Sequence, residues 1–557
     1  MAPVGDPRPE RILENGSVSR SVSLRFTCST QSFRLLLLWC AHAYRPPGMA
    51  VNNQLFKFCG RSASPARGRI QERSCVLSKK FILAVSVLLL VVSSAALAQT
   101  LTPLKHQPPD GIIYTFQLTD GTVMAQGGNC SDFWKLTPDI TGSYVDGTWT
   151  QLASLPSGYA PYATASAVLA DGRLLLEGGE YSDCGGEFTL TNQGAVYQPT
   201  NNTWTTVTAP KGWSYIGDSP STVLANGDYV IGNKLTKQMR ELNPKTMKWT
   251  SIPSKGKKDF DAEEGWTLLA DGSILTADVK DAPNSEIYTP SAKEWVTAGS
   301  TIVDLHSPSP FGCINYGPDG KLCYYPPGEI GPAILRPDGT VFATGSYTSS
   351  GNGAGNTAIY DSLTGKWTVG PVFPNGDNAG DSFAVLLTDG DVLVEGDSGT
   401  SYLFNGTTFT AGPATPGSLM ILPNGQVLVG GGRTEVYTST GTYQTSWQPA
   451  ISSYPSSVTP GSTYSISGTQ FNGLSQAGAF GDEFQFATNY PLVQITNKST
   501  KHVFYARTHN HSSMGVATGS ATVSTNFDVP SSIETGASTL VVIANGIPSA
   551  AVSITVQ

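Results

Sequence analysis

The chain has 557 residues, with 60 Gly, 37 Pro and only 14% charged residues, a composition typical of a turn-rich all-β protein without long helices. The charge is uneven: residues 1–98 carry 13 Lys and Arg against 4 Asp and Glu, whereas residues 99–557 carry 21 against 38, a net charge of −17. Such a segment repels polyanions and lacks the basic stripe that phosphates require, which excludes a nucleic acid as the partner.

The N-terminal 98 residues divide into a leader and an export signal. Residues 1–75 are rich in Arg and Ser and show no strand or helix period, so we expect them to be unstructured or mis-translated, with the true start at Met49 or near Val76. Lys79 and Lys80 precede a 12-residue apolar run and Ala96-Leu-Ala98, which predicts a signal peptide over residues 76–98 that is cleaved after Ala98. The alternative is an uncleaved anchor. Cleavage predicts a secreted, periplasmic or cell-surface protein that does not contact the membrane afterwards.

One pattern recurs seven times along residues 105–448: an apolar run, Asp-Gly or Asn-Gly, and a second apolar run. The copies are FQLTDGTVMAQGG, AVLADGRLLLEGG, TVLANGDYVIG, TLLADGSILTA, AILRPDGTVFATG, AVLLTDGDVLVEG and MILPNGQVLVGGG. Asp-Gly between apolar runs predicts a β-hairpin with a type I′ turn, so we expect positive φ at Gly121, Gly172, Gly227, Gly272, Gly339, Gly390 and Gly425.

A second signal follows the hairpins, an aromatic or leucine seven residues before another aromatic. It occurs as Leu242 to Trp249 and as the pairs Tyr197 to Trp204, Tyr288 to Trp295, Tyr360 to Trp367 and Tyr402 to Phe409. Each unit therefore supplies four strands, and the spacing of about 50 residues is that of kelch repeats. Seven such units predict a seven-bladed β-propeller, whose tryptophans pack between blades. The spacing also places a long insertion at residues 296–330.

The turn pattern ends near residue 449. Residues 449–557 contain short alternating strands such as TYSISG, PLVQIT and AVSITV, which predict a single immunoglobulin-like β-sandwich. Four cysteines follow the cleavage site, which in an exported protein indicates two disulfides. Three pairings are possible, and we favour Cys130 with Cys184 and Cys313 with Cys323. The spacing does not fit a zinc site.

The kelch hairpins with this C-terminal domain, and above all residues 480–519, resemble the galactose oxidase and glyoxal oxidase superfamily. The resemblance implies a copper ion held by a Tyr-His pair, by a second Tyr cross-linked to a Cys, and by a C-terminal His. Tyr162 lies about one place from the cross-linked Tyr, and Thr508-His509 lies where the last His would. The chain contains no Tyr-His dipeptide; Thr415-Pro-Gly417 stands there, and Gly111-Ile-Ile-Tyr114 replaces the Cys. We therefore expect no cofactor and no copper-radical activity.

His509 and His511 alternate, so their imidazoles are weak candidates for a metal site. A polar contact at the seam between propeller and C-terminal domain is the preferred reading, because two imidazoles do not complete a site.

The segments that enter the hairpins are rich in aromatic residues and carboxylates. In a propeller the innermost strands start beside the axis, so these segments line one end of it. Aromatic faces with carboxylates suit sugar rings and cations. The ligand-binding candidates are Tyr162, Trp213, Asp218, Asp261, Glu263, Glu264, Trp266, Tyr325, Glu329, Asp377 and Asp381. The alternative is that these acids cap turns and these rings pack between blades.

Three functions remain open. The first is an exported binding protein that presents the propeller face to a carbohydrate, an envelope component or another protein. The second is an oxidoreductase with an incomplete or altered copper site. The third is a structural surface or adhesion protein.

Overall fold

The computed structural model describes residues 100–186, 188–308, 312–316, 322–324, 328–347, 354–481 and 486–557. The expected leader and signal peptide lie outside these ranges, as does Tyr325. The described part is all-β, with two single-turn 3-10 helices, η2 (Pro374–Gly376) and η3 (Thr445–Trp447). None of the helices in this part of the chain is long and apolar enough to span a membrane.

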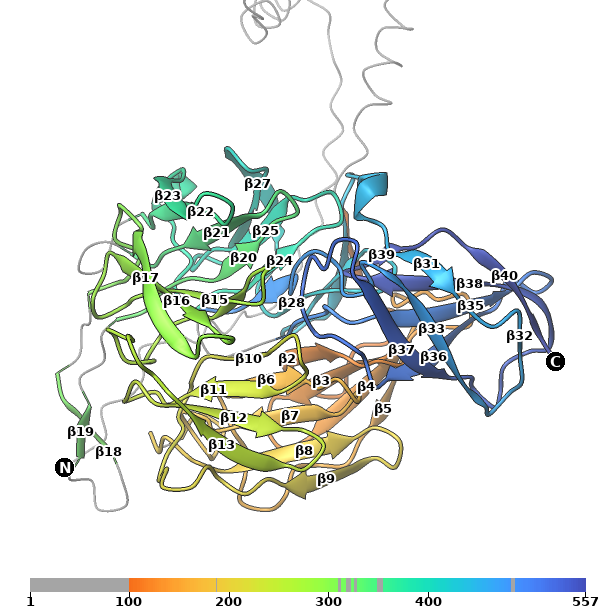
Figure 1. The fold of residues 1–557 in the computed structure, drawn as a ribbon, viewed down its shortest axis with the longest axis horizontal. Helices are drawn as coiled ribbons and strands as arrows, with labels where there is room; N and C mark the ends of the chain where they lie inside the picture. Colours follow the sequence, from red (N-terminus) through yellow and green to blue (C-terminus); the bar gives the residue numbers. More distant parts are fainter. Residues whose placement is uncertain are drawn as a thin grey trace, which may run out of the picture. The chain divides into compact units, whose positions relative to one another are not determined.

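Seven antiparallel sheets form the blades of a propeller, six with four strands and the sixth blade with a fifth strand, β34 (Gly478–Ala479), from the C-terminal part (Figure 1). The first three are blade 1 with β2 (Ile112–Gln117), β3 (Val123–Gly127), β4 (Phe133–Thr137) and β5 (Thr148–Gln151); blade 2 with β6 (Ala165–Val168), β7 (Leu174–Glu177), β8 (Gly194–Gln198) and β9 (Thr203–Thr206); and blade 3 with β10 (Ser221–Val223), β11 (Tyr229–Gly232), β12 (Met239–Asn243) and β13 (Lys248–Ile252). The fourth, blade 4, contains β14 (Thr267–Leu268), β15 (Ile274–Ala277), β16 (Asn284–Thr289) and β17 (Glu294–Ser300).

The remaining blades complete the ring. They are blade 5 with β20 (Ala333–Leu335), β21 (Thr340–Thr344), β22 (Thr357–Asp361) and β23 (Lys366–Val369); blade 6 with β24 (Ala384–Leu386), β25 (Val392–Glu395), β26 (Thr400–Phe404) and β27 (Phe409–Ala414); and blade 7 with β28 (Leu419–Ile421), β29 (Val427–Val429), β30 (Glu435–Thr438) and β1 (Thr100–Pro103). Strand β1 pairs with β30 and so closes the ring. The expected propeller start at residue 105 left this strand out.

Every predicted Asp-Gly or Asn-Gly hairpin joins the first two strands of a blade. All seven predicted glycines have positive φ, between +77° and +91°, as expected. The type I′ assignment was wrong, because the preceding Asp or Asn is not in the left-handed region. In blade 1 the Gly121 N–H donates to the Leu118 carbonyl and the Leu118 N–H to the Thr122 carbonyl, which is a type I turn followed by a glycine bulge. The Asp120 carboxylate accepts the Thr122 N–H at 3.0 Å. This contact explains why an Asp or Asn side chain precedes each of the seven glycines.

The aromatic pairs predicted for the outer hairpins also lie opposite one another. Tyr197 pairs with Trp204, Leu242 with Trp249, Tyr288 with Trp295 and Tyr360 with Trp367. In blade 6 the register differs, because Phe404, and not Tyr402, lies opposite Phe409. Tryptophans pack between blades, as expected: the Trp204 ring centre lies 5.0 Å from that of Phe133 in blade 1, and the Trp367 indole donates to Ser285 of blade 4.

The insertion after blade 4 carries the hairpin β18 (Ile314–Tyr316) and β19 (Leu322–Tyr324). Cys313 and Cys323 form a disulfide across it, as predicted. The Tyr324 ring stacks on Phe188 of the loop between β7 and β8, with ring centres 6.1 Å apart. The insertion is therefore packed against blade 2.

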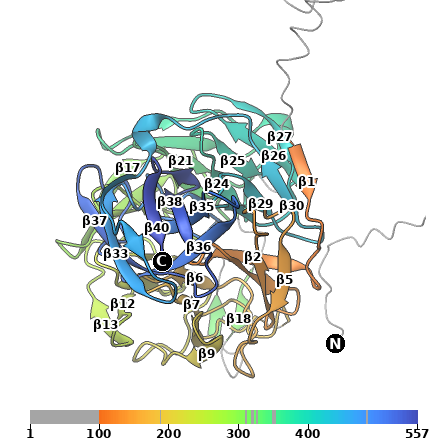
Figure 2. The ribbon, with the colours of Figure 1, turned by 90° about the vertical axis from the view of Figure 1, so that its right-hand side faces the viewer.

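The chain after the propeller forms one path of paired strands around its own apolar core. The strands are β31 (Ala450–Ser453), β32 (Ser457–Val458), β33 (Thr463–Thr469), β35 (Leu492–Asn497), β36 (Val503–His509), β37 (Thr522–Asp528), β38 (Gly536–Ala544), β39 (Ile547–Pro548) and β40 (Val552–Val556). Figure 2 shows them in front of the ring of blades. The immunoglobulin-like assignment stays a prediction.

The C-terminal strands contact the end of the propeller that carries the Asp-Gly turns. The N–H groups of Thr508, His511 and Met514 each donate at 3.0 Å to carbonyls of the turns in blades 1, 2 and 3. Strand β34 (Gly478–Ala479) pairs with β24, the innermost strand of blade 6. Because a hairpin's turn and its open end lie at opposite ends, the entrance segments are left at the other end of the propeller.

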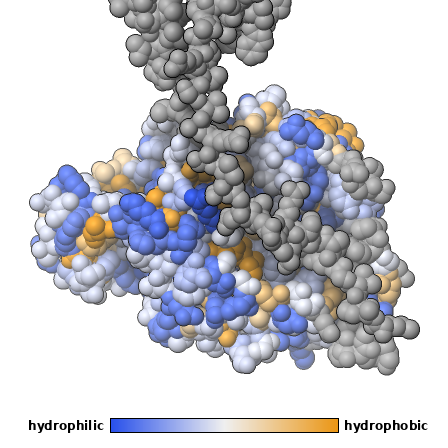
Figure 3. Space-filling model, turned by 180° about the vertical axis from the view of Figure 1, so that it is seen from behind, coloured by the Kyte–Doolittle hydropathy of each residue, from blue (hydrophilic) through white to orange (hydrophobic). Residues whose placement is uncertain are grey.

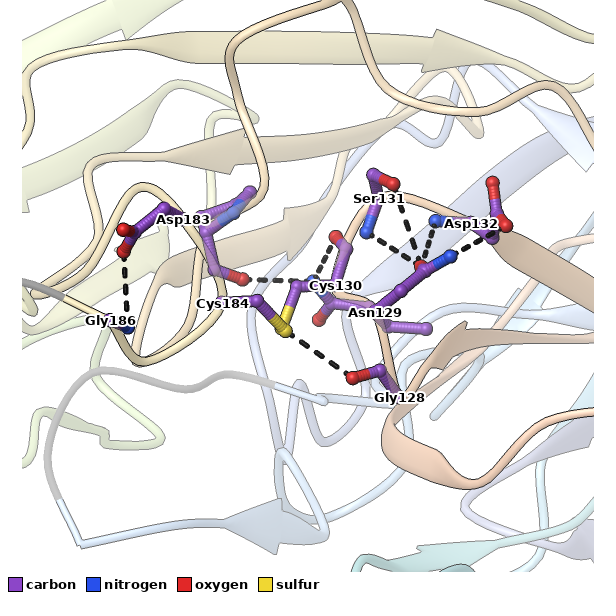
Figure 4. Close-up of a disulfide and its surroundings, with 10 residues drawn as sticks. Gly128, Asn129, Cys130, Ser131, Asp132, Asp183, Cys184 and Gly186 are labelled. Carbon is purple, nitrogen blue, oxygen red and sulfur yellow. Dashed lines mark hydrogen bonds between the residues drawn. A yellow bond between two sulfur atoms is a disulfide. The ribbon is translucent and has the colours of Figure 1, made fainter. Parts of the chain in front are cut away.

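The second disulfide, Cys130 to Cys184, joins the loop after β3 to the loop after β7 (Figure 4). It confirms the predicted pairing. The cysteines are separated by 54 residues, whereas Cys313 and Cys323 are separated by 10. Side chains stabilise the turn next to each cysteine. The Asn129 side-chain oxygen accepts the Asp132 N–H at 2.8 Å, and the Asp183 carboxylate accepts the Gly186 N–H at 3.1 Å.

Replacing Cys130 and Cys184 together with alanine should lower the free energy of unfolding by about 2–4 kcal/mol, because the longer loop restricts the unfolded chain more. The double alanine variant of Cys313 and Cys323 is the matched control, and its free energy of unfolding should fall by a smaller amount. Denaturant unfolding under non-reducing conditions measures both. An equal loss in the two variants would contradict the loop-length argument.

Candidate functional site

The entrance end of the propeller holds a buried lysine surrounded by acids. Lys234 is fully buried, with its Nζ in a salt bridge to Asp218, 2.7 Å from Glu263 Oε1 and 3.7 Å from Glu180 Oε1. Glu329 and Asp381 lie near enough for their charges to act on Glu263 and Glu180. We call these five acids and Lys234 the axial acidic cluster.

Loops from several blades build the axial acidic cluster. Glu180 and Lys234 follow the second strands of blades 2 and 3, whereas Asp218, Glu263, Glu329 and Asp381 precede first strands. The loop after β7 and the loop before β10 meet at Gly178, where only glycine fits. Its φ is +76°, and a Cβ there would lie 2.3 Å from the Gly217 carbonyl oxygen. This close contact sets Glu180 beside Asp218.

The backbone is unusual at two of the acids. Glu263 and Asp381 have φ of +57° and +48°, in the left-handed region that side chains rarely adopt. Such strain persists only where the surroundings impose it, and it is concentrated at functional positions.

The charges of the axial acidic cluster are unbalanced. Burial alone would lower the pKa of Lys234, but Asp218 and Glu263 raise it well above its usual value, so the ammonium stays charged. Burial, followed by the charge of Asp381, raises the pKa of Glu329 well above its usual range. The pKa of Asp381 rises to about 7, although this residue is exposed, because the surrounding protein desolvates its carboxylate and Glu263 and Glu180 repel its charge.

Aromatic rings border the axial acidic cluster. Tyr162 is half-buried, with its ring stacked on Tyr114 at 6.0 Å and tilted against Tyr181 at 6.2 Å. The Tyr324 hydroxyl donates to Glu263 at 3.1 Å, and the Lys234 Nζ lies 5.5 Å from the centre of its ring. The site thus combines half-buried aromatic faces, carboxylate acceptors and one fixed cation.

Five of the predicted candidates are gathered in this region: Tyr162, Asp218, Glu263, Glu329 and Asp381. Asp377 lies elsewhere and is structural, since its carboxylate accepts hydrogen bonds from the Tyr402 hydroxyl at 2.8 Å, from the Ser398 hydroxyl and from backbone N–H groups. The Trp213 indole donates to Gln238 at 2.9 Å under the Arg240 guanidinium, and Trp266 packs on Trp295. The contacts of these three residues are those of turn capping and packing.

Asp261 and Glu264 belong to a separate group inside blade 4. Both are fully buried, and the Lys257 Nζ lies 4.0 Å from Asp261 and 2.7 Å from Glu264. Asp278 and Glu286 complete this group, which we call the blade-4 acidic cluster. Burial raises the pKa of Asp261 to about 7.

Glu180, Tyr181, Lys234 and Tyr324 were missed as candidates. The first three follow the second strand of a blade, and such loops reach the same end as the entrance segments. The usable signal was Asn233-Lys234 after YVIG, where the first, second and seventh repeats have Gly-Gly.

The residues present do not fit the implied copper ion. His509 Nε2 lies 3.0 Å from Asp528 Oδ1, and His511 Nδ1 lies 2.9 Å from the Thr525 hydroxyl. Thr415, in place of a Tyr-His pair, donates to Ser401 at 2.7 Å. His511 also donates its backbone N–H to the Ala170 carbonyl, as expected of a seam residue. Within the described ranges, neither histidine belongs to a group of three potential metal ligands.

No family model and no curated protein matches this chain. Similar solved structures include a fungal alcohol oxidase of the AA5 family in complex with copper, at 14% identity and a TM-score of 0.46, covering 82% of this chain and 99% of that one. A catalytically inactive virginiamycin B lyase from Staphylococcus aureus with quinupristin is 12% identical at a TM-score of 0.41, covering 61% and 99%. The extracellular domain of a putative one component system from B. thetaiotaomicron is 10% identical at 0.40, covering 83% and 58%. The propeller assignment rests on the strand pairings of this chain itself.

Proposed function

We propose that this chain is an exported binding protein whose axial acidic cluster and bordering tyrosines hold a neutral or amine-bearing carbohydrate. The observation that carries the proposal is the excess of carboxyl groups over the one lysine at the end of the propeller opposite the Asp-Gly turns. Two disulfides are compatible with an oxidising compartment outside the cytosol.

The chemistry of the site favours a hydroxyl-rich ligand. Carboxylates accept hydrogen bonds from sugar hydroxyls, and the half-buried faces of Tyr162 and Tyr181 suit the C–H surface of a sugar ring. Although the pKa values of Glu180, Glu329 and Asp381 are raised, the five acids outnumber Lys234. A glycan with carboxylate or sulfate groups would therefore meet no second cation, whereas an ammonium group would be attracted.

The exposed large apolar side chains lie away from the axial acidic cluster. Five of the seven lie on or next to the outer strands of blades 4 and 5, β17 and β23: Val296, Ile302, Leu363, Val369 and Val372. Figure 3 shows orange residues among blue and white ones over the visible face. These side chains have no part in the proposed glycan site.

A glycan array tests the proposal, with binding expected for neutral or amino sugars and not for acidic ones. Replacing Glu329 with Gln and Asp381 with Asn removes the two least buried acids that precede first strands, and should weaken binding at least about tenfold because hydrogen bonds to charged groups are lost. Glu263 is left in place because it pairs with Lys234.

The matched control is Glu294→Gln on the outer strand β17, where the carboxylate pairs with the exposed Lys255 at 2.8 Å. It should bind glycans as the parent does. The proposal fails if the parent binds no glycan, or if the double variant, folded and with an unchanged melting temperature, binds as well as the parent.

A further inference from the structure

The blade-4 acidic cluster has no part in the proposed glycan site and presents a separate problem. Its four carboxylates come from the loop before β14 (Asp261 and Glu264), the loop after β15 (Asp278) and strand β16 (Glu286). All four are buried, with exposures of 0%, 0%, 3% and 1%. Buried carboxylates require partners.

Lys257 compensates only part of this charge. Its Nζ lies 2.8 and 2.7 Å from the two oxygens of Glu264 and 3.0 Å from Glu286 Oε2. Glu286 Oε1 accepts the Lys258 N–H at 2.7 Å, and Glu264 Oε2 also accepts from the Thr276 hydroxyl at 3.2 Å. One ammonium against four carboxylates leaves three formal negative charges inside the blade.

Asp278 is the member of the blade-4 acidic cluster with neither carboxylate oxygen hydrogen-bonded. Both of its carboxylate oxygens are buried and have no hydrogen-bond partner. Neighbouring Asp259 differs, because it accepts the N–H groups of Phe260, Lys280 and Asp281. The unpartnered Asp278 faces Glu264 and Glu286, and one oxygen from each of the three lies within 4.8 Å of the others.

We propose that Glu264, Asp278 and Glu286 bind one calcium ion inside blade 4. An all-oxygen set suits a hard cation, whereas zinc favours nitrogen and sulfur ligands. Calcium accepts irregular oxygen geometry, while magnesium demands a near-ideal octahedron and keeps several waters. A carboxylate has about four lone-pair sites, so Glu264 and Glu286 can contact Lys257 and the ion together.

The competing occupant is a proton on Asp278, and the experiment separates the two. The full chain is stripped with EGTA, and calcium binding is then measured by titration calorimetry alongside the melting temperature with and without calcium. One equivalent of calcium should bind and raise the melting temperature, with magnesium weaker.

The isosteric variant Asp278→Asn should lower the calcium affinity at least about tenfold, because the one ligand without another partner is lost. Asp377→Asn, a buried but fully hydrogen-bonded aspartate of blade 6, is the matched control and should keep the calcium response. Asp381→Asn should also keep it, which excludes the axial acidic cluster as the source.

A parent protein whose melting temperature and heat of titration do not respond to calcium would overturn the proposal. An unchanged response in Asp278→Asn would do so as well. If Asp278→Asn is not folded, Glu286→Gln gives the same comparison. Neither result bears on glycan binding, so this site and the proposed function fail separately.

Discussion

Replacing Lys234 with methionine is expected to lower the free energy of unfolding by about 3–5 kcal/mol at pH 7, the cost of breaking a buried ion pair from one side. The ammonium is fully buried between Asp218 and Glu263, which are themselves 4% and 6% exposed. Without the ammonium, the buried carboxylates of Asp218 and Glu263 would repel each other and the carboxylate of Glu180 with no cation between them. Denaturant unfolding at pH 7 measures the loss.

The pH dependence of the Lys234→Met variant distinguishes lost charge from lost packing. The unpaired carboxylates of the variant would have raised pKa values in the folded state, so the folded variant binds protons more tightly than the unfolded chain. Its stability should therefore rise as the pH falls from 7 toward 4, and the gap to the parent should narrow. A gap that stays constant with pH would contradict the electrostatic explanation.

Two further variants control this experiment. Adding Asp218→Asn and Glu263→Gln to Lys234→Met removes the uncompensated charges and should restore much of the stability. Lys255→Met removes an exposed lysine whose side chain is 78% accessible, and should cost less than about 1 kcal/mol.

The repeat made the propeller predictable, because each blade depends on local signals. Asp120 and Gly121 specify a turn within a few residues, and an aromatic opposite Trp204 or Trp295 specifies the outer hairpin. What local signals could not supply is pairing over long distances. Strand β1 joins β30 through four residue pairs, and β34 joins β24 through two, too few to produce a pattern.

The candidate site was only partly predictable for a related reason. Sequence position places Glu263 and Glu264 together, yet positive φ at Glu263 turns the chain, so that one side chain reaches Lys234 and the other Lys257. Trp213 shares the entrance segments but packs among blades. The sequence shows which residues enter a hairpin, and tertiary packing decides which of their side chains join the axial acidic cluster.

Between pH 7 and pH 4, His511, at the seam between propeller and C-terminal strands, is expected to make a destabilising contribution, while Asp261 and Asp381, with pKa values raised to about 7, act in the opposite direction. The imidazole is 7% exposed, stacks on Tyr490 at 6.0 Å and has a buried Nε2 without a hydrogen-bond partner. Burial, followed by the positive charges of His509 and Arg507, lowers its pKa from 6.5 to about 3. Asp528, which lies beside His509 and Arg507, is the nearby acid.

The sign of this effect follows from proton linkage. Between pH 6.5 and 3, His511 is protonated in the unfolded chain but neutral in the folded protein. Its contribution to the free energy of unfolding is therefore fully present above pH 6.5 and is lost as the pH falls. The loss by pH 4 is roughly 3 kcal/mol, since each unit of pKa difference corresponds to about 1.4 kcal/mol.

His511→Asn tests the prediction, because its amide can replace Nδ1 in the contact with Thr525 but does not titrate. The variant should be less stable than the parent at pH 7 by about 1 kcal/mol, and its stability relative to the parent should rise as the pH falls to 4. His502→Gln, which removes a half-exposed imidazole 2.6 Å from Glu534, is the control and should keep the pH dependence of the parent. If the difference in stability between His511→Asn and the parent is the same at pH 7 and pH 4, the buried imidazole is not the group that makes the seam sensitive to acid.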